Sequence, residues 1–216
     1  LGNMLLLQLD LIMSNTLLGV TTAGTISIVA IVPNAITSIV TMLATIFLPS
    51  YYQDFASENR KELLIKDVQQ AQFVVSGIIS TGIIIFLSFG KVFFNLLVPG
   101  NDSSQLINLS IFYLIPLIIS SMFRPVGNVC IAYNKMKFQA IAMVINGGLN
   151  VLLMTILIKY TSIGIYAIVI STCIISSLWH GVALPIYVAK ITEENILNYY
   201  KIPVIICIQI LVSVFV

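Results

Sequence analysis

The clearest shortage in this 216-residue sequence is charge: 8% of the residues are Asp, Glu, Lys or Arg, whereas 59% are hydrophobic. Soluble domains typically carry about a quarter of charged residues, because their surfaces face water. A chain with so little charge cannot cover a water-exposed surface, so its expected solvent is lipid. We therefore predict a membrane protein.

Several kinds of chemistry lack the residues that they require. The net charge is only +2 and no basic run is present, which excludes a typical nucleic-acid interface. Cys130, Cys173 and Cys207 lie in separate apolar runs and predict small packing residues, with neither a disulfide framework nor a metal site. The sequence contains no glycine-rich phosphate loop and no Ser/His/Asp arrangement for nucleophilic catalysis. We expect no catalytic residue, no cofactor and no ATP hydrolysis, and a protein that is not an enzyme.

Long apolar runs are what the sequence does contain. About 20 residues are needed to cross a hydrocarbon core of about 30 Å. The predicted spans are 1–18, 25–47, 73–89, 106–133, 138–158, 163–188 and 202–216. We predict an all-α, polytopic transmembrane helix bundle that forms a single domain, 1–216, with about six complete spans and a truncated seventh. The chain begins without Met and ends inside an apolar run, so we expect a fragment of a longer protein.

The polar connectors predict an orientation. The shortest, 19–24, is expected to be a turn, and the longest, 53–72, an amphipathic helix on the membrane surface. One alternate set of connectors carries most of the cations: Arg60, Lys61, Lys66, Lys135, Lys137, Lys190 and Lys201. The opposite set carries only Lys91 and Lys159. Because Lys and Arg are enriched in cytoplasmic loops, the first set is predicted to face the cytoplasm.

Polar side chains recur on one face of five predicted spans. The helical spacing places the residues of each span on one face. The five groups, in chain order, are Asp10 and Ser14; Ser27, Asn34, Ser38, Thr41 and Thr45; Ser120, Ser121, Arg124 and Asn128; Gln139, Asn146 and Asn150; and Thr172, Ser176 and His180. Such residues form hydrogen bonds between packed helices, or they line a water-filled cavity for polar cargo. The number of stripes favours a cavity, with Asn34, Asn128, Asn146 and Asn150 among its lining residues.

Asp10 lies near the middle of its predicted span. A charged side chain there costs about 2.5–3.5 kcal/mol on insertion scales, so it is retained for a partner or a role. Its interpretation remains divided between binding of a coupling ion, uptake of a proton, and a structural ion pair with a basic group on another helix.

Arg124 is the second charge inside a predicted span, and Pro116 and Pro125 predict a kinked backbone around it. A guanidinium suits the binding of a phosphate, which predicts anion binding or gating. The alternatives are that Arg124 extends to the interface or pairs with Asp10.

Three segments carry a family resemblance. The segment LLLQLDLIMSNTLLGVTTAGTISIVAIVPNAI places Asp10 before Leu18-Gly19, Ala23-Gly24 and Pro33. It is followed by FLPSYYQDFASENRKELLIKDVQQAQ and then by RPVGNVCIAYNKMKFQAIAMVINGGLNVLLMTILIKYTSIGIYAIVIST. In this order and spacing the segments resemble the C-terminal lobe of polysaccharide and O-antigen flippases of the multidrug/oligosaccharidyl-lipid/polysaccharide exporter superfamily.

The resemblance implies helices seven to thirteen of a two-lobed, alternating-access transporter, with Asp10 and Arg124 facing a central cationic cavity. The implied cargo is a polyprenyl-phosphate-linked oligosaccharide, moved to the outer leaflet of the cytoplasmic membrane. Membrane lipids and glycan-assembly proteins are the implied partners, without nucleic acid. Two alternatives remain: a cation-coupled multidrug or metabolite antiporter of the same superfamily, and an integral-membrane enzyme of glycan assembly. The short outward connectors, poor in catalytic groups, disfavour the enzyme.

Overall fold

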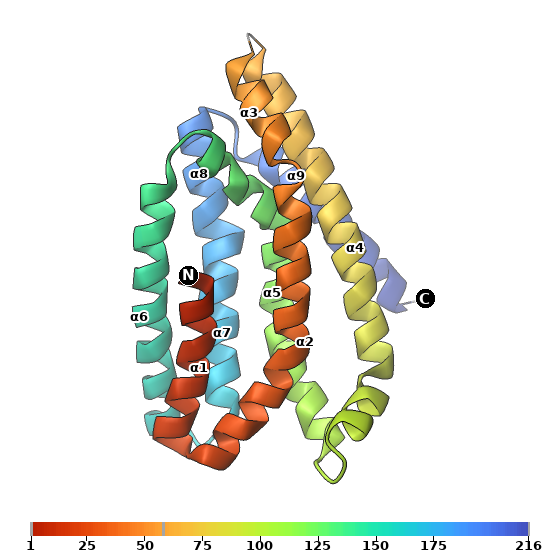
Figure 1. Ribbon diagram of the computed structural model, residues 1–216, viewed down its shortest axis with the longest axis vertical. Coiled ribbons are helices and arrows are strands. Elements are labelled where there is room, and N and C mark those ends of the chain that lie inside the picture. Colours follow the sequence, from red (N-terminus) through yellow and green to blue (C-terminus); the bar gives the residue numbers. More distant parts are fainter. Residues whose placement is uncertain (1, 58, 216) are drawn as a thin grey trace. The chain divides into compact units, whose positions relative to one another are not determined.

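The computed structural model describes the backbone of residues 2–57 and 59–215, and the side chains of residues 8–57 and 59–208. Within these ranges the protein is helical and has no strand (Figure 1). The helices are α1 (Gly2–Leu18), α2 (Val20–Thr45), α3 (Leu48–Ala56), α4 (Arg60–Leu97), α5 (Ser103–Ala132), α6 (Met136–Tyr160), α7 (Tyr166–Leu178), the π-helix η1 (Trp179–Ala183), α8 (Leu184–Thr192) and α9 (Leu197–Phe215). The predicted all-α fold is confirmed.

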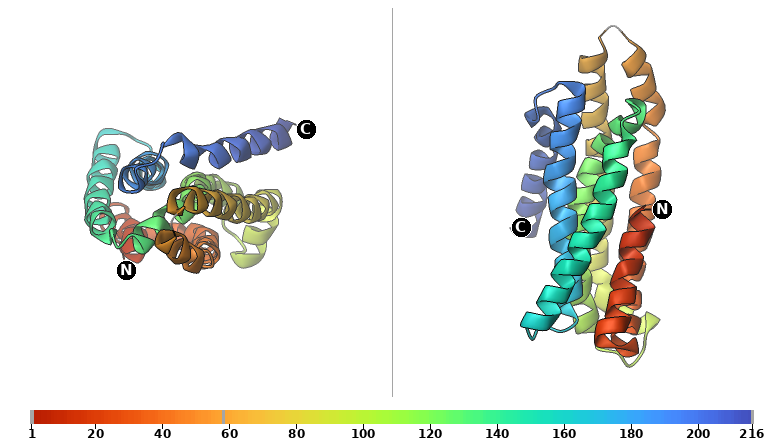
Figure 2. Two further views of the ribbon diagram at one scale, coloured as in Figure 1. Left: turned by 90° about the horizontal axis from the view of Figure 1, so that it is seen from above. Right: turned by 90° about the vertical axis from the view of Figure 1, so that its left-hand side faces the viewer.

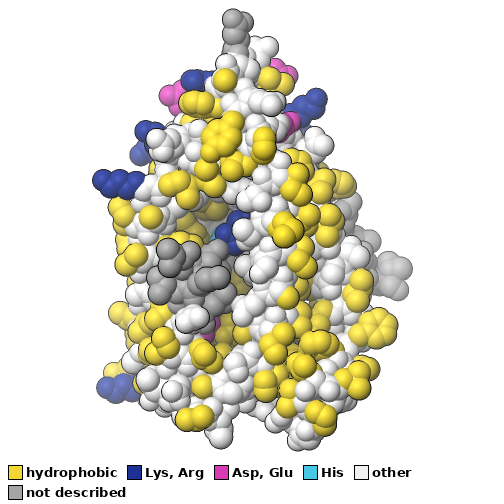
Figure 3. All heavy atoms as spheres, in the orientation of Figure 1, with side chains coloured by type: hydrophobic (Ala, Val, Ile, Leu, Met, Phe, Trp, Pro, Cys, Tyr) yellow, Lys and Arg dark blue, Asp and Glu magenta, His cyan; other side chains and the backbone are white. Residues whose placement is uncertain are grey.

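Five helical segments of the described chain are long and apolar enough to cross a membrane. They are Val20–Ala56, Arg60–Leu97, Ser103–Ala132, Met136–Tyr160 and Tyr166–Thr192. Helices α1 and α9 occupy the predicted first and seventh spans. Hydrophobic side chains cover much of the face that Figure 3 shows, and charged side chains appear around α3 and the start of α4. The chain is therefore a multi-pass membrane protein.

The chain packs as two compact units. Unit 1 comprises Leu1–Ala35, Ile84–Leu117 and Lys137–Ser177. Unit 2 comprises Ile36–Ile83, Ile118–Met136 and Leu178–Val216. Each unit has its own apolar core, centred on side chains such as Val29 and Leu109 in unit 1 and Val68 and Val126 in unit 2.

The first connector is shorter than predicted. The turn is confined to Gly19, whose φ is +94°, and the following residues belong to α2. Glycine adopts this left-handed conformation without the steric cost of a Cβ, so one residue reverses the chain. The predicted turn over 19–24 is wrong in its extent.

The predicted surface helix over 53–72 is also wrong. Its first residues complete α3, which ends at Ala56, and its later residues belong to α4, which begins at Arg60. The Ser57 hydroxyl and backbone N–H both donate to the Asp54 carbonyl, which ends α3. At about 1.5 Å per residue, α4 is about 57 Å long and exceeds a hydrocarbon core of about 30 Å. The polar stretch is thus the end of a long helix rather than a separate one.

The predicted span 163–188 contains a π-helix. Proline has no N–H, so Pro185 cannot donate to the Gly181 carbonyl four residues earlier. The Tyr200 hydroxyl of α9 donates to this carbonyl instead. Neighbouring side chains commonly satisfy backbone groups that proline leaves free in membrane helices. Helix α5, in contrast, continues through Pro116 and Pro125 without a break.

Candidate functional site

The candidate site is the carboxyl group of Asp10, which lies where four helices of unit 1 meet. Only 1% of Asp10 is exposed. Its side chain extends from α1 toward Tyr113 on α5, Asn150 on α6 and Thr172 on α7. Figures 1 and 2 show α1, α6 and α7 running side by side. The apolar core of unit 1, which includes Tyr113, excludes water from this part of the bundle.

Three neutral donors satisfy the two carboxyl oxygens. The Tyr113 hydroxyl donates to Oδ2 over 2.9 Å. The Thr172 hydroxyl lies 2.9 Å from both Oδ1 and Oδ2, so its single proton is shared between them. Asn150 Nδ2 lies 3.3 Å from Oδ1 and 3.0 Å from Thr172 Oγ1. The four side chains therefore form one network.

The network stabilises a negative charge without neutralising it. Hydrogen bonds to an ionised group contribute about 1.5–3 kcal/mol each in soluble proteins, and less on average between membrane helices. Among the described residues, the side chains that donate to the Asp10 carboxyl group are all uncharged. A buried carboxylate among neutral oxygen and nitrogen groups has the chemistry to bind a proton or a small hard cation.

The structure brings together three residues of the predicted stripes: Asp10, Asn150 and Thr172. Asn146 lies one turn from Asn150 on α6 and is half-buried. Its Nδ2 is buried and has no hydrogen-bond partner within the described residues. Asn34, on α2, is exposed. Whether Asn34 and Asn146 line a cavity stays a prediction.

Asn128 and Arg124 belong to unit 2. Asn128 is buried, and its Nδ2 donates to the Ala44 carbonyl over 2.9 Å. Ala44 lies in the last turn of α2, where carbonyls lack a helical donor, so this bond stabilises the end of α2. Arg124 is half-buried on α5. Its predicted binding of phosphate stays a prediction, as does its pairing with Asp10.

Tyr113 is the member of the network that the sequence analysis missed. It precedes Ser120 by seven residues and Arg124 by eleven, so it extends the polar face predicted on that span. Its ring looks apolar in a hydrophobic run, but a buried tyrosine hydroxyl normally requires a partner. The need of the Tyr113 hydroxyl for a hydrogen-bond partner was the sequence signal that could have placed it in the network.

Comparison with known proteins supports the membrane assignment. The chain is similar to an uncharacterized membrane protein, EpsK, of Bacillus subtilis (strain 168), with 26% identity over 194 residues. The similarity covers 88% of this chain and 37% of the relative, so the chain spans little more than a third of that protein. No family model matches the chain. No solved structure matches it either.

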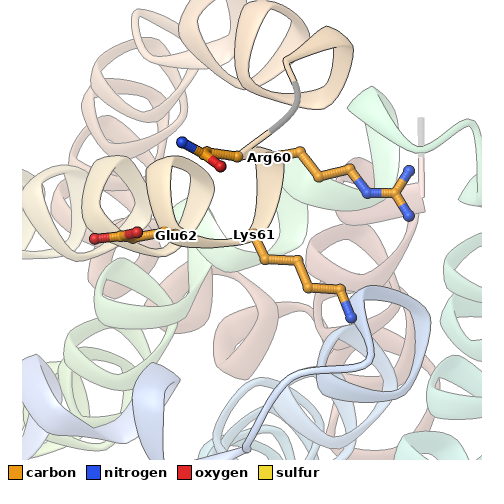
Figure 4. Close-up of a pocket in the computed structure, with 4 residues that line it drawn as sticks. Arg60, Lys61 and Glu62 are labelled. Atoms are coloured by element: carbon orange, nitrogen blue, oxygen red, sulfur yellow. The ribbon is translucent and has the colours of Figure 1, made fainter.

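A second polar feature lies in unit 2, at the start of α4. A hollow of about 320 Å³ is lined by Asn59, Arg60, Lys61 and Glu62. In Figure 4, Arg60 and Lys61 extend on one side of the helix and Glu62 on the other. Lys61 pairs with Glu193 over 3.2 Å, and both side chains are exposed. An exposed pair of this kind contributes at most about 1 kcal/mol, so the hollow suits a solvated helix end better than a ligand site.

Proposed function

We propose that this chain is part of a transporter that moves a polyprenyl-phosphate-linked oligosaccharide from the cytoplasmic to the outer leaflet of the cytoplasmic membrane. In this proposal Asp10 binds the coupling cation, either a proton or an alkali ion. The observation that supports it is the buried carboxyl group at the junction of four helices, whose donors among the described residues are all neutral.

The position of Asp10 explains how binding would be linked to movement. A cation that neutralises Asp10 changes the hydrogen bonds to Tyr113, Asn150 and Thr172 together, because all three share one carboxyl group. Those partners lie on three helices, so occupancy alters the packing of α1 against α5, α6 and α7. A bound ligand shifts a conformational equilibrium only through such differential contacts.

The cargo is supported by the resemblance of three segments to polysaccharide flippases. The similarity to the Bacillus membrane protein supports a membrane location and covers most of the chain. Unit 1 also offers no extended loop for an enzyme of glycan assembly, because its connectors 98–102 and 161–165 are short.

The deciding experiment locates the lipid-linked oligosaccharide in cells that lack the full-length gene. The proposal expects accumulation in the cytoplasmic leaflet and loss of surface glycan, with both restored by the wild-type gene. A normal distribution between leaflets, with unpolymerised glycan outside, would contradict the proposal in favour of an enzyme.

A cation-coupled antiporter is the second candidate, because Asp10 alone would equally serve exchange of a cationic compound. It predicts unchanged surface glycan and increased sensitivity to cationic compounds in the same deletion strain. The two readouts separate the candidates in one set of cells.

A further inference from the structure

Two carboxyl groups meet in unit 2, on the hairpin formed by α3 and α4. Asp54 of α3 interacts electrostatically with Asp67 of α4. Only 8% of Asp54 is exposed, and its Oδ2 is buried and accepts no hydrogen bond within the described residues. One turn before Asp54, the Ser50 hydroxyl donates to Asp67 Oδ2.

This pair lacks a basic partner. Two adjacent carboxylates repel each other, and a positive charge between them removes the repulsion. Among the described residues, the ion pair that forms on this hairpin joins Lys61 to Glu193 and does not involve Asp54 or Asp67. The two carboxyl groups therefore need a cation or a shared proton.

Tyr51 supplies a second, independent observation. It is fully buried, and its hydroxyl has no hydrogen-bond partner within the described part of the chain. The Tyr51 side chain interacts electrostatically with Asp67 and Asp54, so its hydroxyl lies within electrostatic reach of the pair. A buried hydroxyl without a partner is costly, which indicates that a ligand for its oxygen belongs here.

We propose that Asp54 and Asp67 bind a divalent cation, with the hydroxyl oxygens of Ser50 and Tyr51 completing the protein ligands. Two carboxylates balance a double positive charge, and an all-oxygen ligand set selects hard cations such as Mg²⁺, Mn²⁺ or Ca²⁺. A shared proton would link the carboxyl groups but would leave the Tyr51 hydroxyl without a partner. The cation thereby holds α3 against the start of α4, in a unit that does not contain Asp10.

The test uses the full-length protein, purified in detergent and freed of metal with EDTA. Titration with Mn²⁺, monitored by electron paramagnetic resonance, should show saturable binding. The temperature of thermal unfolding should rise when Mn²⁺ is added. Asp67→Asn should weaken Mn²⁺ binding roughly tenfold or more, because it removes a charged ligand. Glu62→Gln is the matched control, since Glu62 is an exposed acid on the same helix, and it should bind Mn²⁺ as the wild type does.

Three results would overturn the site: no saturable Mn²⁺ binding by the wild type, equal binding by Asp67→Asn, or stability that depends on pH and not on Mn²⁺. The last result would identify a shared proton. If Asp67→Asn does not fold, Asp54→Asn tests the same prediction from α3. Transport is not measured, so the outcome is independent of the proposed flippase.

Discussion

Asp10 occupies a buried position where, among the described residues, neutral donors hold its carboxyl group. Tyr113, Asn150 and Thr172 each donate to it, and each comes from a different helix. A change in the charge or position of the carboxyl group therefore alters all three hydrogen bonds at once.

Replacing Asp10 with Asn should abolish transport. The amide keeps the size of the side chain but has no negative charge to attract a cation and takes up no proton, whereas insertion and abundance in the membrane should stay normal. The measurement is the leaflet distribution of the lipid-linked oligosaccharide in cells that carry the variant. Normal transport by Asp10→Asn would exclude a coupling role for this residue.

Tyr113→Phe tests the network more finely, because it removes one donor and keeps the ring in the apolar core. We expect partial transport and a loss of about 0.6–2 kcal/mol in the free energy of unfolding, as for hydrogen bonds between membrane helices. Tyr160→Phe is the control, since Tyr160 is 76% exposed. Equal stability of the two variants in detergent would show that the Tyr113 bond contributes nothing.

Arg124 also offers a test at this scale. If its guanidinium contacts a phosphate, Arg124→Lys should retain partial transport and Arg124→Ala little, because Lys keeps the charge but loses bidentate geometry. Full transport by both variants would instead indicate a side chain that only reaches the interface.

At the scale of elements, two prolines of unit 2 remove backbone donors from their helices, and side chains of neighbouring helices donate to the carbonyls left free. Pro185 leaves the Gly181 carbonyl to the Tyr200 hydroxyl. Pro203 cannot donate to the Tyr199 carbonyl, which accepts from Gln72 Nε2 over 3.0 Å. Gln72 also donates to the Met122 carbonyl over 3.0 Å, so this one buried side chain connects α4 with α5 and α9. These bonds replace the helical ones that proline removes.

A double-mutant cycle on Tyr200 and Pro185 tests whether the hydrogen bond from the Tyr200 hydroxyl replaces the helical hydrogen bond that Pro185 removes. Tyr200→Phe should lower the free energy of unfolding by about 0.5–1.5 kcal/mol, because the Gly181 carbonyl loses its donor. In the Pro185→Ala background the loss should be smaller, since the introduced alanine supplies the missing N–H. Unfolding in detergent measures both. Equal losses in the two backgrounds would show that the Tyr200 bond does not replace the helical one.

At the scale of the whole molecule, the alternation of connectors predicts which loops share a side of the membrane. The connectors 98–102 and 161–165 alternate along the chain with 133–135 and 193–196. Lys135 lies in the second pair, and Lys137, Lys190 and Lys201 lie in the helix ends that flank it, which predicts that this pair faces the cytoplasm.

Cysteine labelling checks this orientation. In a background where Cys130, Cys173 and Cys207 are replaced by Ala, Asn101→Cys should react with an impermeant maleimide added to intact cells. Asn195→Cys should react only after the membrane is opened, because its loop lies on the other side. The opposite pattern of labelling would reverse the orientation.

The sequence by itself determined the solvent, the helical class and the approximate position of the five helical segments that are long and apolar enough to cross a membrane. These follow from the length of apolar runs, since a bilayer of fixed thickness imposes the same requirement on each segment separately. It also identified Asp10, because an ionised group in such a run is conspicuous wherever its neighbours lie.

Only the tertiary structure decided which groups meet. Tyr113 joins Asp10 across 103 positions of sequence, and Thr172 across 162. The interaction between Asp54 and Asp67 depends on the division of the expected surface helix between α3 and α4. A helical period shows which face a residue occupies but not which helix lies opposite, and that choice is made by packing of the whole bundle.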